Sequence, residues 1–402
     1  MPESADKRIL YISYTGLLEP LGQSQVYRYL MKLAEDHDIT LITYENPEDL
    51  EDTERVASLR EAVESVGINW HPLTYHHSPT LPATIWDLVN GFQVCVRAIR
   101  RNDIEIVHTR SYVVSVLGLL CKQLFGTAFV FDMRGFWADE RVDGDLWEAD
   151  SQLYRSAKWF EAQFLRHADV VVSLTDAGVD AIEDFDHVDT EETQFEKIPT
   201  CVDLDLFTPQ LDHRKNNFVL GYVGSAGTWY RFGDVLECFE ILREKRPDSR
   251  LRILNRGDHE YINEQLSEFG IERNAVTIKA VDHAEVPAEM NQMDAGIFFY
   301  TPTFSKKGTS PTKMGEFLAC GIPCVSNTAV GDVESILETN TVGITIDSFG
   351  TEAKQQAMDS LLALHSDPAI VERCRSVAES YYSLEAGVNK YAEIYRSVFD
   401  DD

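Results

Sequence analysis

Short, nearly continuous apolar runs alternate along the chain with amphipathic or polar stretches of helical length. In the first half, these runs predict buried strands at 8–14, 38–44, 104–110, 128–133 and 168–174. Such runs are typical of parallel strands that helices cover on both faces. The alternation therefore predicts an α/β domain in which helical crossovers connect the strands of a parallel sheet.

A second series of strands follows an irregular segment. Residues 198–217 contain two prolines, no clear periodicity and a polar end, and therefore predict a linker. The strands expected after the linker lie at 218–224, 250–255, 275–280, 295–300, 322–327 and 342–346. We expect two Rossmann-like domains, 1–205 and 206–384, whose parallel sheets face each other across a cleft, because ligands of such sheets bind beyond the carboxyl ends of the strands.

The charge of the chain narrows the range of partners. Its 402 residues include 67 acidic and 36 basic side chains, a net charge of −31, which excludes a non-specific nucleic-acid binder. Lysine is scarce, with 13 Lys against 23 Arg, which predicts solubility in concentrated salt; an ordinary acidic cytosolic enzyme is the alternative. Seven scattered cysteines without a Cys-x-x-Cys pair, and no long apolar run, lead us to expect a cytoplasmic protein.

Two glycine-containing loops each follow the first strand of a domain. In the first loop, Gly22 precedes an expected helix start near Gln23, where backbone amides can bind an anion or simply close a turn. In the second, Gly224 begins a turn that lacks the Gly-x-Gly-x-x-Gly spacing of dinucleotide sites. Arg231 lies near the next helix start, either as a phosphate clamp or on a solvated helix face.

The segment 301–327 carries the strongest chemical pattern. A loop rich in Ser, Thr and Lys leads into a helix with Glu316 in its first turns, then a Gly-Ile-Pro break and a strand. Lys313 precedes a methionine, so the segment is not a P-loop. Since phosphate repels a carboxylate, we expect Glu316 to accept hydrogen bonds from neutral hydroxyls such as those of a ribose, or to act only as a helix-start carboxylate.

Three segments together resemble the family 4 glycosyltransferases of GT-B fold: SPTKMGEFLACGIPCV (310–325), IPTCVDLDLFTP (198–209) and YVGSAGTWYRFGDVL (222–236). The resemblance extends over nearly the whole chain. It implies a retaining, metal-independent enzyme that transfers a sugar from a nucleoside-diphosphate sugar bound mainly by the C-terminal domain. It also implies that a last helix, at about 385–402, packs back on the N-terminal domain.

The resemblance assigns roles to individual positions. Glu316 would hold the ribose hydroxyls, and Ser310, Thr312 and Lys313 would approach the diphosphate. The other donor-site residues would come from the two glycine loops: Gly22, Gln23, Gly224 and Arg231. Arg231 and Lys313 would stabilise the charge that develops on the departing diphosphate.

The chain departs from the family at the donor sugar. A first glutamate normally precedes Glu316 by eight positions and reads the sugar, but this position is Gly308. Lys306 and Lys307 lie just upstream and are the sugar-proximal alternatives, for example for an acidic sugar. The sequence leaves the donor sugar open.

A second departure follows the strand at 128–133. Many relatives place a histidine there, whereas this chain has Asp-Met-Arg-Gly, with Asp132 and Arg134. These two side chains either contact the sugar or acceptor as catalytic residues or form a buried pair at the strand end. His108, which ends the preceding strand, either faces the cleft or is a core histidine.

The resemblance thus implies a hexosyltransferase-type enzyme with a glycan, lipid-linked or small-molecule acceptor, active in polysaccharide or glycan assembly. We expect no metal, because Asp-x-Asp triplets arise by chance in so acidic a chain, and no cofactor besides the donor. A nucleotide-sugar epimerase and a non-catalytic sugar-nucleotide binding protein are the alternatives. The helix expected at 82–101, with arginines at its end, either docks on an anionic membrane at its inner face or uses these arginines as helix-dipole partners.

Overall fold

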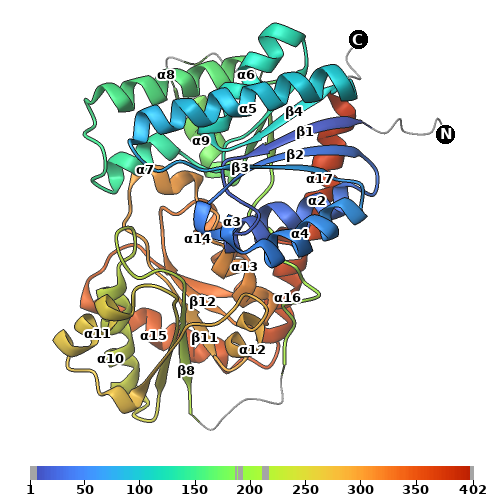
Figure 1. Ribbon diagram of the computed structural model, residues 1–402. Helices are drawn as coiled ribbons and strands as arrows, with labels where there is room; N and C mark the ends of the chain where they lie inside the picture. Colours follow the sequence, from blue (N-terminus) through green and yellow to red (C-terminus); the bar gives the residue numbers. More distant parts are fainter. Residues whose placement is uncertain (1–6, 186–187, 189–192, 211–216, 399–402) are drawn as a thin grey trace.

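The computed structural model describes residues 7–185, 188, 193–210 and 217–398. Its residues form two α/β domains, stacked one above the other in Figure 1. Most of residues 211–217, the end of the predicted linker, and the last residues of the predicted C-terminal helix, 399–402, lie outside the described residues.

The first domain is built on a seven-stranded parallel sheet with the order β3-β2-β1-β4-β5-β6-β7. Its strands are β1 (Arg8–Ser13), β2 (Asp38–Glu45), β3 (Asn69–Thr74), β4 (Ile106–Arg110), β5 (Ala128–Asp132), β6 (Val170–Ser173) and β7 (Gln194–Lys197). Successive side chains of β1 pack into different clusters, Ile9 on one face and Leu10 on the other, because helices cover both faces.

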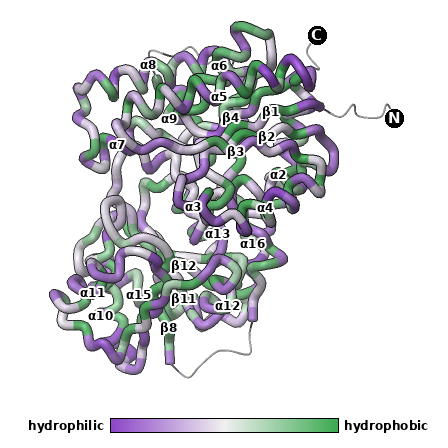
Figure 2. The backbone as a smooth tube through the Cα atoms, in the orientation of Figure 1, coloured by the Kyte–Doolittle hydropathy of each residue, from purple (hydrophilic) through white to green (hydrophobic). Residues whose placement is uncertain are grey.

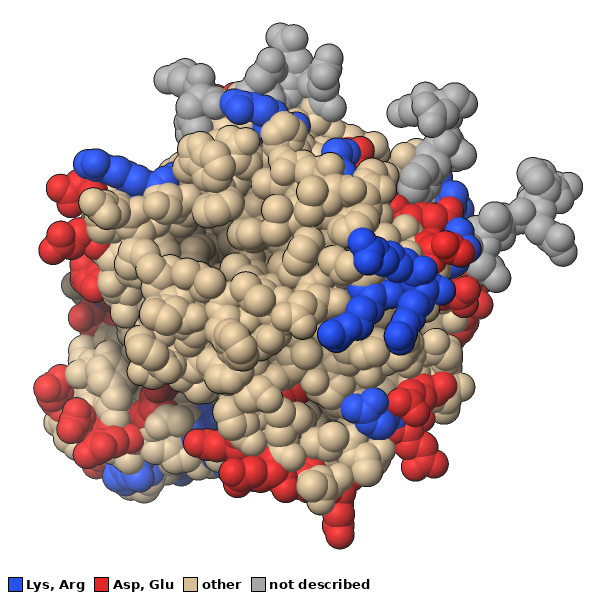
Figure 3. All heavy atoms as spheres, turned by 45° about the horizontal axis from the view of Figure 1, so that its top comes forward, with Lys and Arg blue, Asp and Glu red and all other residues tan. Residues whose placement is uncertain are grey.

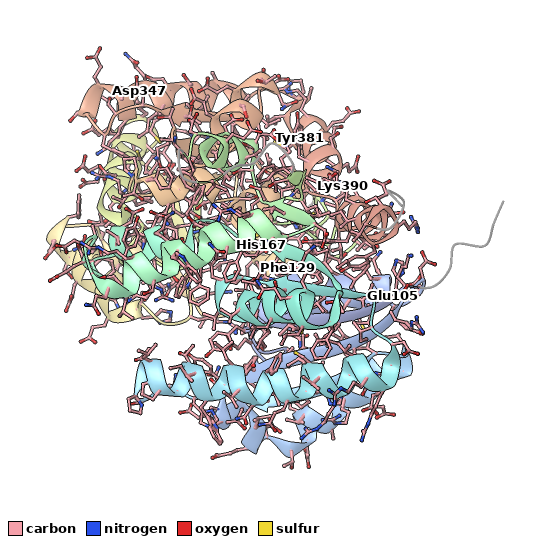
Figure 4. The ribbon with its side chains drawn as sticks, turned by 90° about the horizontal axis from the view of Figure 1, so that it is seen from above. Glu105, Phe129, His167, Asp347, Tyr381 and Lys390 are labelled. Carbon is pink, nitrogen blue, oxygen red and sulfur yellow. The ribbon has the colours of Figure 1, made fainter. Side chains whose placement is uncertain are left out.

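The helices of the first domain lie in two layers (Figure 1). They are α1 (Pro20–Gly22), the π-helix η1 (Gln23–Tyr27), α2 (Arg28–Leu33), α3 (Pro47–Glu51), α4 (Thr53–Ser65), α5 (Thr80–Asn102), α6 (Tyr112–Phe125), α7 (Trp137–Asp143), α8 (Gln152–His167) and α9 (Asp176–Glu183). Helices α5, α6 and α8 cover one face side by side, as the view from above shows with His167 at the end of α8 (Figure 4).

The second domain contains a six-stranded parallel sheet with the order β10-β9-β8-β11-β12-β13. Its strands are β8 (Val219–Val223), β9 (Arg250–Leu254), β10 (Val276–Lys279), β11 (Ala295–Ile297), β12 (Cys324–Asn327) and β13 (Gly343–Ile346). Its helical segments are α10 (Phe232–Lys245), α11 (His259–Glu268), η3 (Arg273–Ala275), α12 (Val286–Met290), η4 (Phe304–Gly308), α13 (Thr312–Ala319), α14 (Val333–Thr339), α15 (Thr351–His365) and α16 (Ile370–Tyr381).

The expected fold class is confirmed, and every strand that the sequence predicts is present. The apolar strands of both sheets stand out along the chain in Figure 2. Sequence analysis missed β3 and β7, which are the two edges of the first sheet. Edge strands need less apolar sequence because one side of the strand has no neighbour. Strand β3 even contains Pro72; a proline cannot donate a hydrogen bond to a neighbouring strand, and within sheets it is therefore found at edges.

The chain crosses between the domains twice, and the two crossings touch. The amide of Val202 in the linker donates to the carbonyl of Tyr382 (2.7 Å), and the amide of Leu384 donates to the carbonyl of Val202 (3.2 Å). Helix α17 (Leu384–Ser397) then packs on the first domain against α2, where the sequence led us to expect a helix at about 385–402. Within the described residues, no helix combines the length and the apolar character needed to cross a bilayer.

Candidate functional site

The glycine turn after β8 lies directly against Lys313 of α13. Gly224 has φ +102°, and a Cβ at this position would lie 3.0 Å from the Lys313 ammonium nitrogen. A side chain there would therefore be strained and would also displace the lysine. The two elements that the sequence links to a donor diphosphate thus meet at the carboxyl end of the second sheet.

The Lys313 ammonium lies among four aromatic rings. Its nitrogen is 4.3 Å from the ring centre of Tyr230, 5.3 Å from that of Tyr222, 5.9 Å from that of Tyr300 and 6.0 Å from that of Phe298. Burial lowers the pKa of this lysine, although Tyr230 and Glu316 favour its charged form. No described carboxylate forms an ion pair with it, so the site carries an uncompensated cation that an anion would complete.

Glu316 lies one turn further along α13 and is also buried. Burial raises the pKa of its carboxyl group to about 7, an effect that Lys313 partly opposes. Its nearest basic group is the His283 imidazole, whose Nε2 is 4.0 Å from Oε1. Because no hydrogen bond from a described donor satisfies this carboxylate, it can accept hydrogen bonds from a ligand's hydroxyl groups.

A narrow crevice brings the two domains together at Glu316. It is lined on the donor side by Glu316, Thr312 and His283, and on the N-terminal side by Gln25 and Arg28. Thr312, a predicted donor-binding residue, therefore shares a cavity with Glu316. The crevice is a gap between α13 and the segment formed by η1 and the start of α2, where the sequence predicts the cleft.

The N-terminal glycine turn is a tightly packed loop. A Cβ on Gly22 would lie 1.8 Å from the Gly16 carbonyl oxygen, so the turn has no room for a side chain there. The buried Glu45 carboxylate accepts hydrogen bonds from two amides of the loop, and the Gln23 side chain donates to the Leu17 carbonyl (2.5 Å). The Gln23 side chain therefore holds the turn itself, and contact with a donor would come from other atoms of the loop.

Asp132 and Arg134 form a buried cluster with the C-terminal helix. Tyr391 of α17 donates to the Asp132 carboxylate (3.0 Å), and an Arg134 nitrogen lies 3.8 Å from it. Burial alone would raise the pKa of Asp132, but Arg134, with His108 and Arg110, holds it below its ordinary value. Arg134 has φ +57°, a strained conformation for a residue with a side chain, and such strain collects at functional sites.

His108 lies deeper in the same cluster. It has no exposed surface, its Nδ1 is 2.6 Å from the Tyr395 hydroxyl, and its Nε2 is 3.9 Å from Asp132. Burial lowers the pKa of the imidazole. This arrangement favours the core role over contact with the cleft.

The loop before α13 contacts the first domain along its length. The Ser310 hydroxyl accepts a hydrogen bond from the Thr200 amide of the linker (3.2 Å). Lys306 pairs with Glu140 of α7 (3.0 Å), whereas Lys307 is exposed and lies over the Phe304 ring. All three predicted residues therefore face the domain junction or solvent, and Lys306 is neutralised by a carboxylate.

Gly308 lies directly against the other domain. A Cβ there would be 2.9 Å from the Gly135 Cα and 3.1 Å from the Phe136 ring. The position at which the resemblance leads us to expect a sugar-reading glutamate therefore has no space for any side chain in this arrangement.

Arg231 takes part in other contacts than Lys313. Its Nε donates to Asp234 (2.7 Å), and its guanidinium stacks over Phe349 at 4.0 Å. Its side chain is about one third exposed. A contact between Arg231 and a diphosphate remains a prediction, and the structure places the Lys313 ammonium closer to the glycine turn.

Sequence analysis missed the aromatic residues around Lys313, and also His283, Gln25 and Arg28. These residues come from separate loops and strands, and no spacing in the sequence connects them. Among the described residues, no group of three His, Cys, Asp or Glu side chains is arranged to hold a metal ion.

Comparison with known proteins indicates the class of protein to which this chain is similar. Residues 23–195 match the model of the glycosyl transferase 4-like domain, and residues 205–379 match that of the glycosyl transferases group 1. These matches indicate a GT-B glycosyltransferase similar to family 4. No curated protein was found that matches the chain in sequence.

Solved glycosyltransferase structures share the fold. Sucrose-phosphate synthase from Thermosynechococcus elongatus superposes with a TM-score of 0.74 at 15% identity, covering 98% of this chain and 100% of its own. HepE from Anabaena in complex with UDP gives 0.70 at 14% identity, covering 97% and 100%. WaaG, a glycosyltransferase involved in lipopolysaccharide biosynthesis, gives 0.61 at 14% identity, covering 97% and 100%.

Proposed function

We infer that this glycosyltransferase transfers a hexose from a nucleoside-diphosphate sugar, with retention of configuration and without a metal ion. The acceptor class is a glycan, a lipid-linked saccharide or a small molecule. The observation that supports the proposal most is the arrangement on α13, where a buried ammonium without a carboxylate partner lies one turn from a buried carboxylate without a donor. A nucleoside diphosphate supplies both missing partners, its phosphates for Lys313 and its ribose hydroxyls for Glu316.

In the proposed reaction, Lys313 stabilises the negative charge that develops on the leaving diphosphate. A fixed ammonium in a water-poor aromatic surrounding does this more strongly than one in bulk water. The acceptor hydroxyl attacks the anomeric carbon on the face from which the diphosphate departs, the bond to the diphosphate breaks, and a phosphate oxygen takes the hydroxyl proton. This route needs no strong base from the protein.

The relatives support a nucleotide-sugar donor. HepE has been crystallised with UDP-glucose, and the group 1 model spans the half of this chain that contains Lys313 and Glu316. We propose that the enzyme acts in the cytoplasm in polysaccharide or glycan assembly, and that its acidity adapts it to concentrated salt.

Incubation with a panel of nucleoside-diphosphate sugars tests the proposed reaction. We expect slow release of free sugar and nucleoside diphosphate from one donor, with the anomer of the sugar retained when an acceptor is added, and no loss of activity with a chelator. An epimerised donor would identify an epimerase, and binding without turnover would identify a non-catalytic binding protein.

Substitution of Glu316 tests the assignment within the site. Glu316→Gln should weaken binding of the nucleoside and of the nucleoside diphosphate alike, because both contain the ribose. Arg231→Ala should weaken only the diphosphate if Arg231 reaches it. Unchanged affinity in Glu316→Gln would show that the ribose lies elsewhere.

A further inference from the structure

Three neighbouring helices carry a surface that differs in charge from the rest of the protein. Helices α5, α6 and α8 contain only two carboxylates, Asp87 and Glu161, and both are fully buried. About one residue in six of the whole chain is acidic. The outward surface of these helices is therefore free of acidic side chains in a protein whose net charge is −31.

The same surface exposes large apolar side chains. Seven of them are between 46% and 61% exposed: Leu81, Ile85, Trp86 and Val89 on α5, Leu124 on α6, and Leu153 and Trp159 on α8. On α5 the exposed line continues through Gln93 to the exposed Arg97, Arg100 and Arg101. Figure 3 shows this side as a broad face, with basic side chains clustered at one edge and acidic side chains along the margins.

The arginines at the end of α5 are free to contact a partner. No ion pair joins Arg97, Arg100 or Arg101 to another residue in the part of the chain that the structure describes. The left-handed Asp103 that follows the helix pairs with Arg8 instead. The favourable interaction of a cation with the helix dipole is confined to the last turn, which contains Arg100 and Arg101. The dipole therefore does not account for Arg97.

We propose that the exposed face of α5, α6 and α8, called the apolar-basic face below, docks on the surface of a lipid bilayer that contains anionic lipids. Tryptophan prefers the boundary between lipid and water, and aliphatic side chains can enter the acyl region to a shallow depth. The arginines match anionic headgroups, which would repel the rest of this acidic protein. A second copy of the chain would bring the same basic edge and no anionic counterpart, and a nucleic acid would leave the tryptophans without a partner.

The docking mode predicts two separable contributions. In dilute salt, the arginines give a preference for anionic over neutral lipid. In 1 M salt the screening length falls to about 3 Å, so the arginines contribute little to binding. The apolar side chains should still bind the vesicles, more weakly and with equal affinity for anionic and neutral lipid. The proposal concerns a surface remote from Lys313 and does not depend on the transfer reaction.

Co-sedimentation with vesicles of phosphatidylglycerol and phosphatidylcholine tests the proposal, with pure phosphatidylcholine vesicles for comparison. The intact protein should bind the anionic vesicles more tightly at about 0.1 M salt. The triple variant Arg97→Gln/Arg100→Gln/Arg101→Gln should lose roughly fivefold in partition coefficient per arginine, or on the order of 100-fold in all, because one basic residue at such a surface contributes about 1 kcal/mol. Trp86→Ser/Trp159→Ser should weaken binding in both dilute and concentrated salt.

A matched variant controls for total charge. Arg246→Gln/Arg256→Gln/Arg273→Gln removes three exposed arginines from the second domain and should leave vesicle binding unchanged. Circular dichroism in each buffer checks that every variant is folded. The proposal is overturned if the intact protein ignores anionic vesicles, if both triple variants lose binding equally, or if the Trp86→Ser/Trp159→Ser variant instead dissociates a dimer seen by sedimentation.

Discussion

Replacing Lys313 by methionine should stabilise the protein while it weakens the binding of a nucleoside diphosphate. Lys313 and Lys354 are both buried lysines, 7% and 1% exposed, but their surroundings differ. Lys354 pairs with the carboxylates of Asp234 and Glu237, whereas Lys313 faces aromatic rings. The pair therefore allows a direct comparison between a compensated and an uncompensated buried cation.

The sign of each effect follows from these contacts. The desolvation of an ammonium costs several kcal/mol, and cation–π contacts return only about 0.5 to 2 kcal/mol. Methionine fills a similar volume without that cost, so Lys313→Met should raise the free energy of unfolding by about 1 to 2 kcal/mol at pH 7. Lys354→Met leaves the partly exposed Glu237 without its cation and leaves Asp234 with Arg231 alone, so it should lower the free energy of unfolding by about 1 to 3 kcal/mol.

The gain from Lys313→Met should also depend on pH. Burial lowers the folded-state pKa of Lys313 below the unfolded value of 10.5. The unfolded chain therefore binds the proton more tightly, and the cost of the ammonium is complete at pH values below the folded-state pKa. The cost disappears as the pH rises toward 10.5, so the advantage of the variant should shrink over that interval.

Urea denaturation at fixed salt measures the stabilities, and calorimetry measures the binding of a nucleoside and its diphosphate. Loss of one charge-assisted contact, about 1.5 to 3 kcal/mol, should weaken diphosphate binding by roughly 10- to 150-fold and leave nucleoside binding unchanged. A Lys313→Met variant that is destabilised as strongly as Lys354→Met, or that binds the diphosphate normally, would refute the assignment of an anion site to Lys313.

Four further predictions follow from the same contacts. Burial raises the pKa of Glu316 from 4.5 to about 7, so the free-energy cost of burying its ionised carboxylate is absent below pH 4.5 and complete above pH 7. Glu316→Gln should therefore raise the free energy of unfolding by roughly 3 kcal/mol at pH 8 and leave it unchanged at pH 4, as measured by urea titration at both pH values. Gly308→Ala should lower the free energy of unfolding by about 1 to 3 kcal/mol, because the new methyl group overlaps with the opposite domain. Gly350→Ala should leave the free energy of unfolding unchanged, because no atom lies within 4 Å of the position of its Cβ. Thermal unfolding measures the two stabilities, and the radius of gyration from X-ray scattering shows whether the domains separate in Gly308→Ala. Asp132→Asn should lower the free energy of unfolding by about 3 to 5 kcal/mol, because it removes the carboxylate that compensates the buried Arg134. Asp359→Asn, which breaks an exposed ion pair, should lower it by less than about 1 kcal/mol; urea denaturation measures both. Finally, the free energy of unfolding should rise with KCl concentration as salt screens the net charge of −31, and a flat dependence would contradict salt adaptation.

Sequence analysis predicted the fold well because both sheets are parallel and buried on both faces. Their strands must then be nearly continuous apolar runs, which a reader of the sequence can recognise. The edge strands escape this rule. Strand β3 carries His71 and Pro72 among its residues, and β7 reads Gln-Phe-Glu-Lys, so neither differs from a polar loop in sequence alone.

The candidate site was only partly predictable. Lys313 and Glu316 could be named together because they lie on one helix, three residues apart, and the spacing survives folding. The rings around Lys313 could not, because Tyr222 lies within strand β8, Tyr230 lies in a loop and Tyr300 follows strand β11. The ion pair of Arg231 could have been predicted from the sequence, because Asp234 follows three residues later and residues at this spacing are neighbours on a helix.

The two segments in which the sequence departs from the expected family pattern lie against each other. Gly308, where the family resemblance leads us to expect a sugar-reading glutamate, packs against Gly135 of the Asp-Met-Arg-Gly segment, where it leads us to expect a histidine. Gly135 adopts φ +104°, a conformation that favours glycine, and Arg134 before it is also left-handed. A side chain at either glycine would therefore overlap with the opposite domain. The Lys306 and Glu140 pair joins the domains beside this contact, together with the hydrogen bond from the Ser305 amide to the Asp143 carboxylate (3.0 Å). We therefore expect a donor sugar that enters at this junction either to separate the Lys306 and Glu140 pair or to contact it.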